Sequence, residues 1–201
     1  MCVGYPRLVV YLEGVVVIRQ LLFLLKSWQN YSKNTKISIK LSQEIILKRW
    51  ETMKIVQATI EDLDGVSNLF NSYRKFYQQE SDLEGAKAYI KERMEGKESV
   101  IFVVKDKENY LGFTQLYPTF SSISMKRAWI LNDLYVDSNA RKQGVGEMLL
   151  HKAKEYAIET GAKSISLSTA PDNDSAQRLY EKNGYKKDTQ FYHYELELVG
   201  S

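Results

Sequence analysis

A mostly apolar strand that leads into a glycine-containing turn and then a helix constrains this 201-residue chain more than any other feature. Residues 130–136 predict a buried strand, and residues 145–157 carry apolar side chains at helical spacing. Between them, Arg141, Gly144 and Gly146 form the spacing R-x-x-G-x-G. The start of a helix offers unpaired backbone N–H groups, and glycine lets an anion approach them closely. The segment therefore predicts a phosphate-binding turn.

Two common phosphate-binding motifs do not account for this turn. A dinucleotide-binding fold has G-x-G-x-x-G in its first strand–helix unit, whereas G-x-G stands here late in the chain and follows an arginine. A nucleoside-triphosphate P-loop requires Gly-Lys-Ser/Thr, which does not follow these glycines. Taken alone, the turn also fits an ordinary connection between a strand and a helix.

The charge of the chain is spread unevenly, although its total is only +3. Residues 1–53 contain 8 Lys and Arg against 3 Asp and Glu, a balance of +5, which leaves −2 for residues 54–201. This mildly acidic part argues against a nucleic-acid partner. Cys2 is the only cysteine, and His151 and His193 are the only histidines, so we expect neither a disulfide framework nor a metal site. The length suits one domain with a full core.

Residues 1–52 differ from the rest, and we expect them to be an extension outside a domain that spans residues 53–201. Leu8–Leu25 is strongly apolar, but it contains charged residues that are costly in a bilayer, and no cleavage pattern follows it. We therefore expect a cytoplasmic protein. A membrane-tethered protein is an alternative that depends on this segment alone. Our hypothesis for the difference is that Met53 is the true start and that the preceding residues are mis-assigned.

From Met53 onward, the pattern predicts strands that alternate with helices. The expected strands cover residues 54–58, 100–105, 110–117, 130–136, 163–169 and 190–198. The expected helices are one capped by Thr59, one from the capping box Ser81–Glu84 to Gly96, one that ends at Gly161, and one from Asn173 or Asp174 to Gly184. Residues 118–126 are expected to form a Ser-rich loop. This order predicts an α/β or α+β fold with a mixed sheet.

A second motif follows the expected strand at 164–169: Asn173-x-x-Ala176-x-x-Leu179-Tyr180-x-x-x-Gly184-Tyr185. By itself, a short helix that faces the core and ends at glycine would explain it. Together with R-x-x-G-x-G one helix and one strand earlier, it resembles the paired motifs of the GNAT superfamily of N-acetyltransferases. The similarity extends to polyamine and histone-acetyltransferase-like members. The resemblance covers residues 53 to about 198.

The resemblance implies acetyl-CoA as co-substrate, a splayed central sheet flanked by helices, and a homodimer. It implies that the end of the central strand contacts the acetyl group and pantetheine, and that the turn holds the pyrophosphate. The matching residues are Leu134, Tyr135 and Val136 on the strand, and Arg141, Lys142, Gln143, Gly144, Val145 and Gly146 in the turn. Asn173 matches a residue that contacts the pantetheine arm, and Tyr180 matches the tyrosine that protonates the departing CoA thiolate.

The expected acceptor is a primary amine, either a small polyamine-like molecule or a lysine side chain. An aminoglycoside is a further candidate acceptor. Asn132-Asp133 resembles the acidic pair of spermidine/spermine acetyltransferases, which makes Asp133 a candidate to orient the amine or relay its proton. A polar strand residue satisfied by its neighbours is an equal alternative. Phe76, Tyr77 and Glu80 lie where the family builds its acceptor cleft and would attract a cation. Helix capping is the simpler explanation for the acidic residues there.

Residues 53–201 contain no cysteine, which excludes an acyl-cysteine intermediate there and favours direct transfer within a ternary complex. A main-chain amide of Leu134 or Val136 would polarise the thioester carbonyl. The alternative function is a non-catalytic acetyl-CoA-binding sensor or scaffold. Tyr180 counts against that alternative, because a sensor has no need of an acid for the thiolate.

Overall fold

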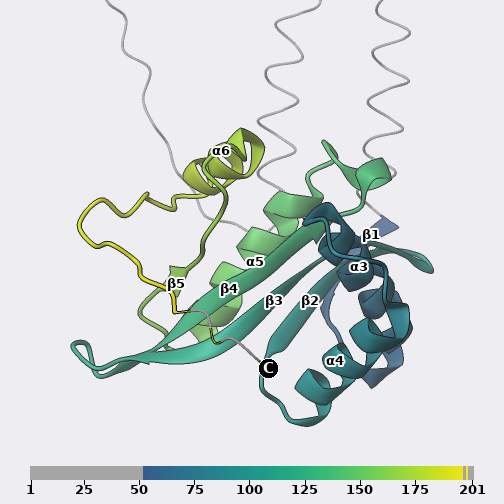
Figure 1. The fold of residues 1–201 in the computed structure, drawn as a ribbon, viewed down its shortest axis with the longest axis horizontal. Helices are drawn as coiled ribbons and strands as arrows, with labels where there is room; N and C mark the ends of the chain where they lie inside the picture. The colour runs from purple at the N-terminus through teal and green to yellow at the C-terminus, as the bar shows by residue number, and fades with distance from the viewer. Residues whose placement is uncertain (1–51, 197, 199–201) are drawn as a thin grey trace, which may run out of the picture. The chain divides into compact units, whose positions relative to one another are not determined.

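The computed structural model describes residues 52–196 and residue 198. A five-stranded sheet with the order β1-β2-β3-β4-β5 forms its centre (Figure 1). The strands are β1 (Met53–Gln57), β2 (Val100–Asp106), β3 (Asn109–Ser121), β4 (Lys126–Val136) and β5 (Ile165–Ser166). Neighbouring strands are antiparallel except β4 and β5, which are parallel. The expected mixed sheet is therefore confirmed.

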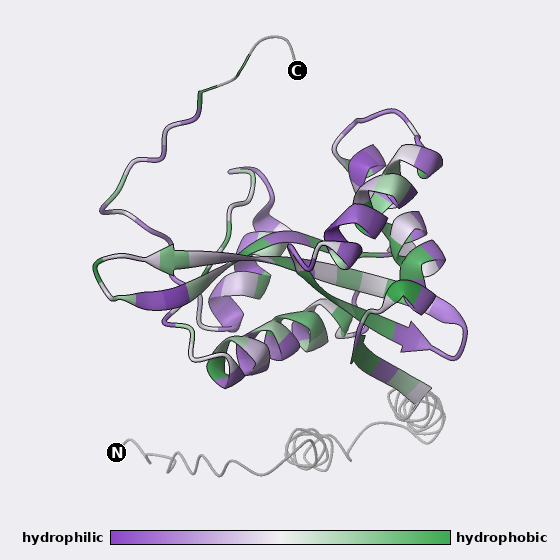
Figure 2. Cartoon of the chain, turned by 90° about the horizontal axis from the view of Figure 1, so that it is seen from below, coloured by the Kyte–Doolittle hydropathy of each residue, from purple (hydrophilic) through white to green (hydrophobic). Residues whose placement is uncertain are grey.

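Four α-helices and two short 3₁₀ turns accompany the sheet within the described residues. The helices are α3 (Leu63–Phe76), α4 (Leu83–Glu95), α5 (Val145–Glu159) and α6 (Asp174–Lys182), and the turns are η1 (Ile60–Asp62) and η2 (Ser138–Ala140). Helices α3 and α4 cover one face of the sheet, and α5 covers the other (Figures 1 and 2). Each face has its own apolar core, around Phe113 beneath α3 and around Leu149 of α5.

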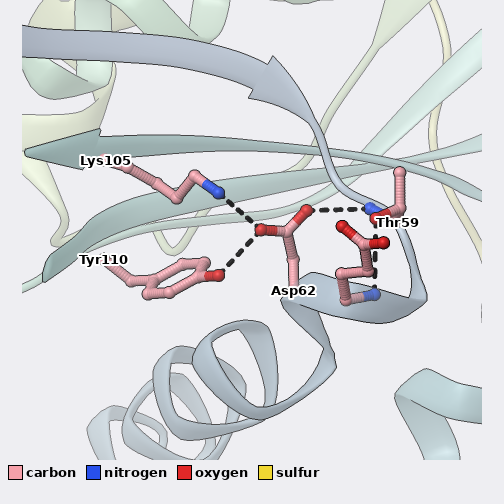
Figure 3. Close-up of polar contacts among 5 residues, drawn as sticks. Thr59, Asp62, Lys105 and Tyr110 are labelled. Carbon is pink, nitrogen blue, oxygen red and sulfur yellow. Dashed lines mark hydrogen bonds and ion pairs between the residues drawn. The ribbon is translucent and has the colours of Figure 1, made fainter. Parts of the chain in front are cut away.

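A buried carboxylate ties the start of α3 to the hairpin of β2 and β3 (Figure 3). Asp62 accepts hydrogen bonds from the Lys105 ammonium at 2.6 Å and the Tyr110 hydroxyl at 2.7 Å. It also accepts one from the Thr59 N–H at 3.0 Å, as part of a capping box. Burial would raise the pKa of Asp62, but these three donors outweigh it and lower the pKa. Gly65 makes room for the Tyr110 ring, since an added Cβ would overlap that ring.

Helix α4 begins one residue later than the expected capping box. Asp82 is the N-cap, and its Oδ1 accepts a hydrogen bond from the Gly85 N–H at 2.8 Å. The Ser81 hydroxyl instead accepts a hydrogen bond from Asn71 Nδ2 of α3 at 3.0 Å. The carboxylate of Asp82 reaches the helix N-terminus because Ser81 is held by this contact with the neighbouring helix. The expected end of α4 at Gly96 is confirmed.

The hairpin of β3 and β4 is longer than the sequence suggests. A Ser-rich loop is expected over residues 118–126, but β3 continues to Ser121 and β4 begins at Lys126. The Arg127 guanidinium lies 5.1 Å from the centre of the Phe120 ring across the two strands. Such cross-strand contacts stabilise an antiparallel pair even where serine is frequent.

The expected last strand over residues 190–198 is wrong for the residues that the structure describes. Residues 190–196 and 198 have no regular secondary structure, and Phe191, Tyr192 and Tyr194 are exposed. Strand β5 is also shorter than the expected 163–169. Alternating apolar residues suit a strand, but a strand also needs a neighbouring strand to pair with, and alternation does not supply one.

The expectations about residues 1–51, including the apolar segment Leu8–Leu25 and the mis-assigned start, lie outside the described residues. In the part that is described, no helix combines the length and the apolar composition needed to cross a membrane. Nor does that part contain a group of three or more His, Cys, Asp or Glu residues that could hold a metal ion.

Candidate active site

Strands β4 and β5 separate next to the turn that precedes α5. They pair only through Ile165 and Ser166 of β5, at the beginning of β4. Farther along, Leu134–Val136 pairs with β3 on one edge, and no strand of the described residues pairs with its other edge. Backbone N–H and C=O groups that lack a ladder partner are available for other hydrogen bonds. The splayed sheet therefore leaves a row of main-chain groups at the end of β4.

The turn between β4 and α5 presents the uncapped start of a 15-residue helix. Gly144 is the N-cap, and its φ of 84° lies in the left-handed region that favours glycine. No side chain caps the first-turn N–H groups, where the positive end of the helix dipole lies. Lys142 also belongs to this turn, and Arg141 Nε donates a hydrogen bond to the Val136 carbonyl at 3.2 Å. Free N–H groups and two cations suit a pyrophosphate.

The neighbours of this glycine make contacts that shape the turn. Gln143 Nε2 donates a hydrogen bond to the Asn139 carbonyl at 2.7 Å, and Val145 is buried in the core beneath α5. A Cβ added to Gly146 would lie 3.0 Å from Leu179 Cδ2. Because Gly146 has no side chain, α6 packs closely against α5 at this position.

Helix α6 buries Tyr180, which is 9% exposed. Asn173 caps the helix, since its Oδ1 accepts a hydrogen bond from the Ala176 N–H at 3.2 Å. The Tyr180 ring lies 5.9 Å from the Tyr185 ring. Burial raises the pKa of Tyr180 to about 12, and the nearby Tyr77 contributes to the rise. The Tyr180 hydroxyl therefore keeps its proton at neutral pH and is able to donate it.

Asp133 is a buried carboxylate at an irregularity in β4. The register with β3 shifts at Gln115, so that Asn132 is the extra residue of a β-bulge. Asp133 is 3% exposed, and Asn132 Nδ2 donates to its two carboxylate oxygens at 3.2 and 3.3 Å. Burial raises the pKa of Asp133, although hydrogen bonding from Asn132 and Tyr73 opposes the rise. None of the ion pairs formed among the described residues involves Asp133.

Aromatic side chains lie over the face of the sheet that carries Asp133. The pKa of Tyr73 is raised by burial and by the negative charge of Asp133. The Tyr73 ring makes edge contacts with the rings of Tyr77 at 5.0 Å, Phe113 at 6.1 Å and Tyr135 at 6.4 Å. The buried carboxylate thus lies among rings from α3, β3 and β4.

Two further tyrosines affect the hydroxyl of Tyr73. The ring of Tyr77 lies 5.0 Å from that of Tyr73, and both Tyr77 and Tyr180 contribute to the raised pKa of Tyr73. Asp133, Tyr77 and Tyr180, which the sequence suggests for three separate reasons, therefore all influence the pKa of Tyr73. Sequence reasoning missed Tyr73 because it counted this residue only as part of the apolar stripe of α3. A hydroxyl within an apolar stripe, one helical turn before Tyr77, is the signal that could have found it.

A second pair of tyrosines lines the sheet beside α4. The hydroxyls of Tyr89 and Tyr117 lie 2.8 Å apart, and the Tyr117 hydroxyl is affected by the charge of Asp133. The Tyr89 ring stacks on Phe70 with 5.3 Å between their centres, and the Arg93 guanidinium lies 4.6 Å from its centre. The contacts of Tyr89 with Tyr117 and Phe70 connect α4 to β3 and α3.

The remaining residues expected to bind the acceptor lie at or beyond the end of α3. Phe76 and Tyr77 are about half-exposed, and the Arg141 guanidinium lies 5.8 Å from the Phe76 ring. The expected acceptor residues and the expected phosphate turn are therefore adjacent. Glu80 is exposed, and its main-chain carbonyl accepts a hydrogen bond from an arginine of α3 at 3.4 Å. No contact within the described part of the chain joins its carboxylate to Asp133.

Comparison with known proteins connects this arrangement to a family. The model of the "Acetyltransferase (GNAT) family" matches residues 66–185. The chain is 52% identical over 146 residues to the "Uncharacterized N-acetyltransferase YhfO" of Bacillus subtilis, which covers 73% of this chain and 98% of that protein. It is 29% identical over 147 residues to a "Probable acetyltransferase" of Haemophilus influenzae, which covers 73% of this chain and 99% of that protein.

A solved structure resembles the fold as well as the sequence. It is described as the "Crystal structure of a probable acetyltransferase" and superposes with a TM-score of 0.70 at 46% sequence identity. The match covers 74% of this chain and 99% of that chain.

Proposed function

Because the chain belongs to the GNAT family of N-acetyltransferases and is an acyltransferase, we propose that it moves the acetyl group of acetyl-CoA directly to a cationic primary amine. The observation that carries the proposal is Asp133, which is 3% exposed and forms no ion pair within the described residues. A buried charge without a partner is costly. An ammonium group on the acceptor supplies the missing partner.

In this proposal, the turn before α5 holds the pyrophosphate of acetyl-CoA. The uncapped helix N-terminus at Gly144 and the charges of Arg141 and Lys142 support this placement. The edge of Leu134–Val136 that pairs with no described strand suits the amide groups of the pantetheine arm, and we assign Asn173, the N-cap of α6, to the same arm. Bound there, acetyl-CoA supplies a thioester whose carbonyl carbon is open to attack.

Each chain residue has a defined part in the transfer. Asp133 binds the ammonium group and accepts one of its protons, which frees the nitrogen lone pair. A main-chain N–H of Leu134 or Val136 donates to the carbonyl oxygen as negative charge develops there. The N–C bond forms, the C–S bond breaks, and Tyr180 donates its proton to the departing sulfur. A second proton leaves the acceptor nitrogen and replaces the one that Tyr180 gave.

The acceptor class that fits is a primary ammonium group on an alkyl chain, as in a polyamine-like molecule or a lysine side chain. The exposed rings of Phe76 and Tyr77 would contact the chain, and cation–π contact favours a charged end. We further propose that the protein is located in the cytoplasm and forms a homodimer.

Free CoA release tests the proposed function. The full chain would be mixed with acetyl-CoA and, separately, spermidine, an aminoglycoside, amino acids and a lysine-rich peptide. We expect release with an acceptor that carries a primary ammonium group, and none with acetyl-CoA alone. If acetyl-CoA binds but no amine stimulates release, the protein is better explained as a non-catalytic acetyl-CoA sensor or scaffold.

A further inference from the structure

A cavity lies at the end of β4 that is opposite to the turn before α5. Strand β4 runs from Lys126 to Val136 and leads into that turn, whereas Arg127 and Trp129, at its beginning, line the cavity. The cavity has a volume of about 760 Å³, which is the size of pockets that hold small organic ligands. None of the residues assigned above to acetyl-CoA or to the amine lines it.

The long hairpin of β3 and β4 creates this cavity. Strand β2 begins at Val100, opposite Leu116 of β3, but β3 continues to Ser121 and pairs there with β4 alone (Figure 1). The residues that follow β1, the end of α4 and the last turn of α5 supply the other walls. The cavity therefore lies among regular elements of the fold.

Much of the lining is apolar and held in place by packing. Trp129 and Ile101 are 4% and 3% exposed, and the Tyr156 ring lies 5.2 Å from the Trp129 ring. The Trp129 Nε1–H donates a hydrogen bond to Thr160 Oγ1 at 2.9 Å, so its one donor is already satisfied by the chain. These walls suit the apolar body of a ligand.

The charged side chains of the lining leave positive charge without a partner. The Arg127 guanidinium lies 5.1 Å from the centre of the Phe120 ring and 5.4 Å from that of Trp129. None of the ion pairs among the described residues includes Arg127 or Lys97. The one acid of the lining, Glu95, pairs instead with a lysine one helical turn earlier, at 3.7 Å. Two cations of the cavity therefore lack an anion.

We propose that this cavity binds a small carboxylate with an apolar body. A guanidinium held flat on aromatic rings presents N–H groups that match the two oxygens of a carboxylate. Lys97 adds positive charge. Ser99 Oγ accepts a hydrogen bond from the Gln115 amide at 2.6 Å, so the hydrogen of this hydroxyl is free to point toward the ligand. The apolar body then lies against the walls around Trp129.

Titrations followed by NMR test this proposal on the full chain without any turnover. Among the three tryptophans of the chain, the indole N–H signal of Trp129 is identified by its absence from Trp129→Phe. The probes are phenylacetate and hexanoate, their uncharged amides phenylacetamide and hexanamide, and inorganic phosphate. We expect at least one carboxylate to shift the Trp129 signal in a saturable way, and its amide to bind about tenfold more weakly. Phosphate should give no saturable shift, because it has no apolar body.

Two variants locate the charge that binds the carboxylate. Arg127→Gln should lower the affinity by about tenfold, the effect of losing a hydrogen bond to a charged group. Lys126→Gln is the matched control, since it removes the same charge from the adjacent residue, which does not line the cavity and points to the other face of β4. The control should keep the affinity of the wild type.

The comparison of carboxylate with amide uses the wild-type protein, so it decides the matter even if Arg127→Gln does not fold. The proposal is overturned if neither carboxylate shifts the Trp129 signal, or if the amides bind as tightly as the carboxylates. It is also overturned if phosphate binds as well as the carboxylates, or if folded Arg127→Gln keeps the wild-type affinity.

Discussion

Gly146 in the first turn of α5 and Leu179 in α6 are packed so closely that a Cβ on the glycine would lie 3.0 Å from Leu179 Cδ2. Leu179 directly precedes Tyr180, so this contact determines how closely α6 places the tyrosine against α5. A glycine that the motif suggests for phosphate binding therefore also positions the helix that carries the candidate acid.

Gly146→Val places a branched side chain in this contact. We expect it to push α6 outward and to lower the free energy of unfolding by about 1–3 kcal/mol, as overpacking does. Turnover should fall more than acetyl-CoA affinity, because Tyr180 moves while the N–H groups of the turn remain. Thermal unfolding, calorimetry with acetyl-CoA and CoA release measure the three effects. Wild-type turnover in a folded Gly146→Val protein would show that α6 does not depend on this contact.

Gly144→Glu places a side chain and a negative charge at the N-terminus of α5, where φ is 84°. We expect acetyl-CoA binding to be lost, because the side chain fills the approach to the N–H groups and repels the phosphates. Gly161→Glu is a matched control, since Gly161 also has a positive φ, of 66°, and open space around it. The control should share the backbone strain and keep the affinity. If Gly144→Glu binds acetyl-CoA with unchanged affinity, this turn does not bind the phosphates.

Tyr180→Phe removes the hydroxyl that we assign to the departing thiolate and keeps the ring. General acid catalysis contributes about 10²- to 10⁴-fold, so kcat should fall within that range while acetyl-CoA still binds. Tyr185→Phe is the control, because Tyr185 lies beside Tyr180 and is not assigned a role in the transfer. If Tyr180→Phe retains full kcat, water protonates the sulfur.

Asp133→Asn should lose activity toward cationic amines and yet be more stable at neutral pH. Burial raises the pKa of Asp133 above its unfolded value, so its stability contribution is complete below the unfolded pKa and is lost as pH rises through the folded pKa. At pH 7 the wild type carries a buried charge that the variant lacks. We expect the melting temperature to rise by about 2–4 °C for each kcal/mol of penalty removed.

The higher stability of Asp133→Asn should disappear near pH 3, where Asp133 of the wild type is protonated in both the folded and the unfolded chain. Thermal unfolding of both proteins at pH 3 and pH 7 tests the sign. A variant that is less stable than wild type at pH 7 would show that Asp133 is paired by the chain itself.

Local signals predicted much of the fold, including the glycine that ends α4 and a cap of α6 at Asn173 or Asp174, of which Asn173 is the N-cap. They were wrong where a partner distant in sequence decides the outcome. Because the Ser81 hydroxyl contacts Asn71 of α3, Asp82 caps α4 instead of Ser81. The apolar alternation of residues 190–198 resembles a strand, but pairing depends on a neighbour that local sequence does not contain.

The candidate site was predictable where a motif carries it and not where packing does. The turn at Gly144 and the tyrosine of α6 are visible in the sequence. The bulge that buries Asp133 arises from the register between β3 and β4, which is not a local property. Tyr73 has the helical spacing of a core residue, and only the folded chain shows that the charge of Asp133 raises its pKa.

Direct transfer of the acetyl group to the acceptor nitrogen is the central claim, and a single-turnover experiment with ¹³C-acetyl-CoA tests it most directly. The acceptor and the full-length protein would both be analysed by mass spectrometry over the time course. We predict that the label appears on an amine nitrogen of the acceptor and that the protein never carries it. Label retained on the protein, or released only as acetate while the amine stays unmodified, would contradict this account.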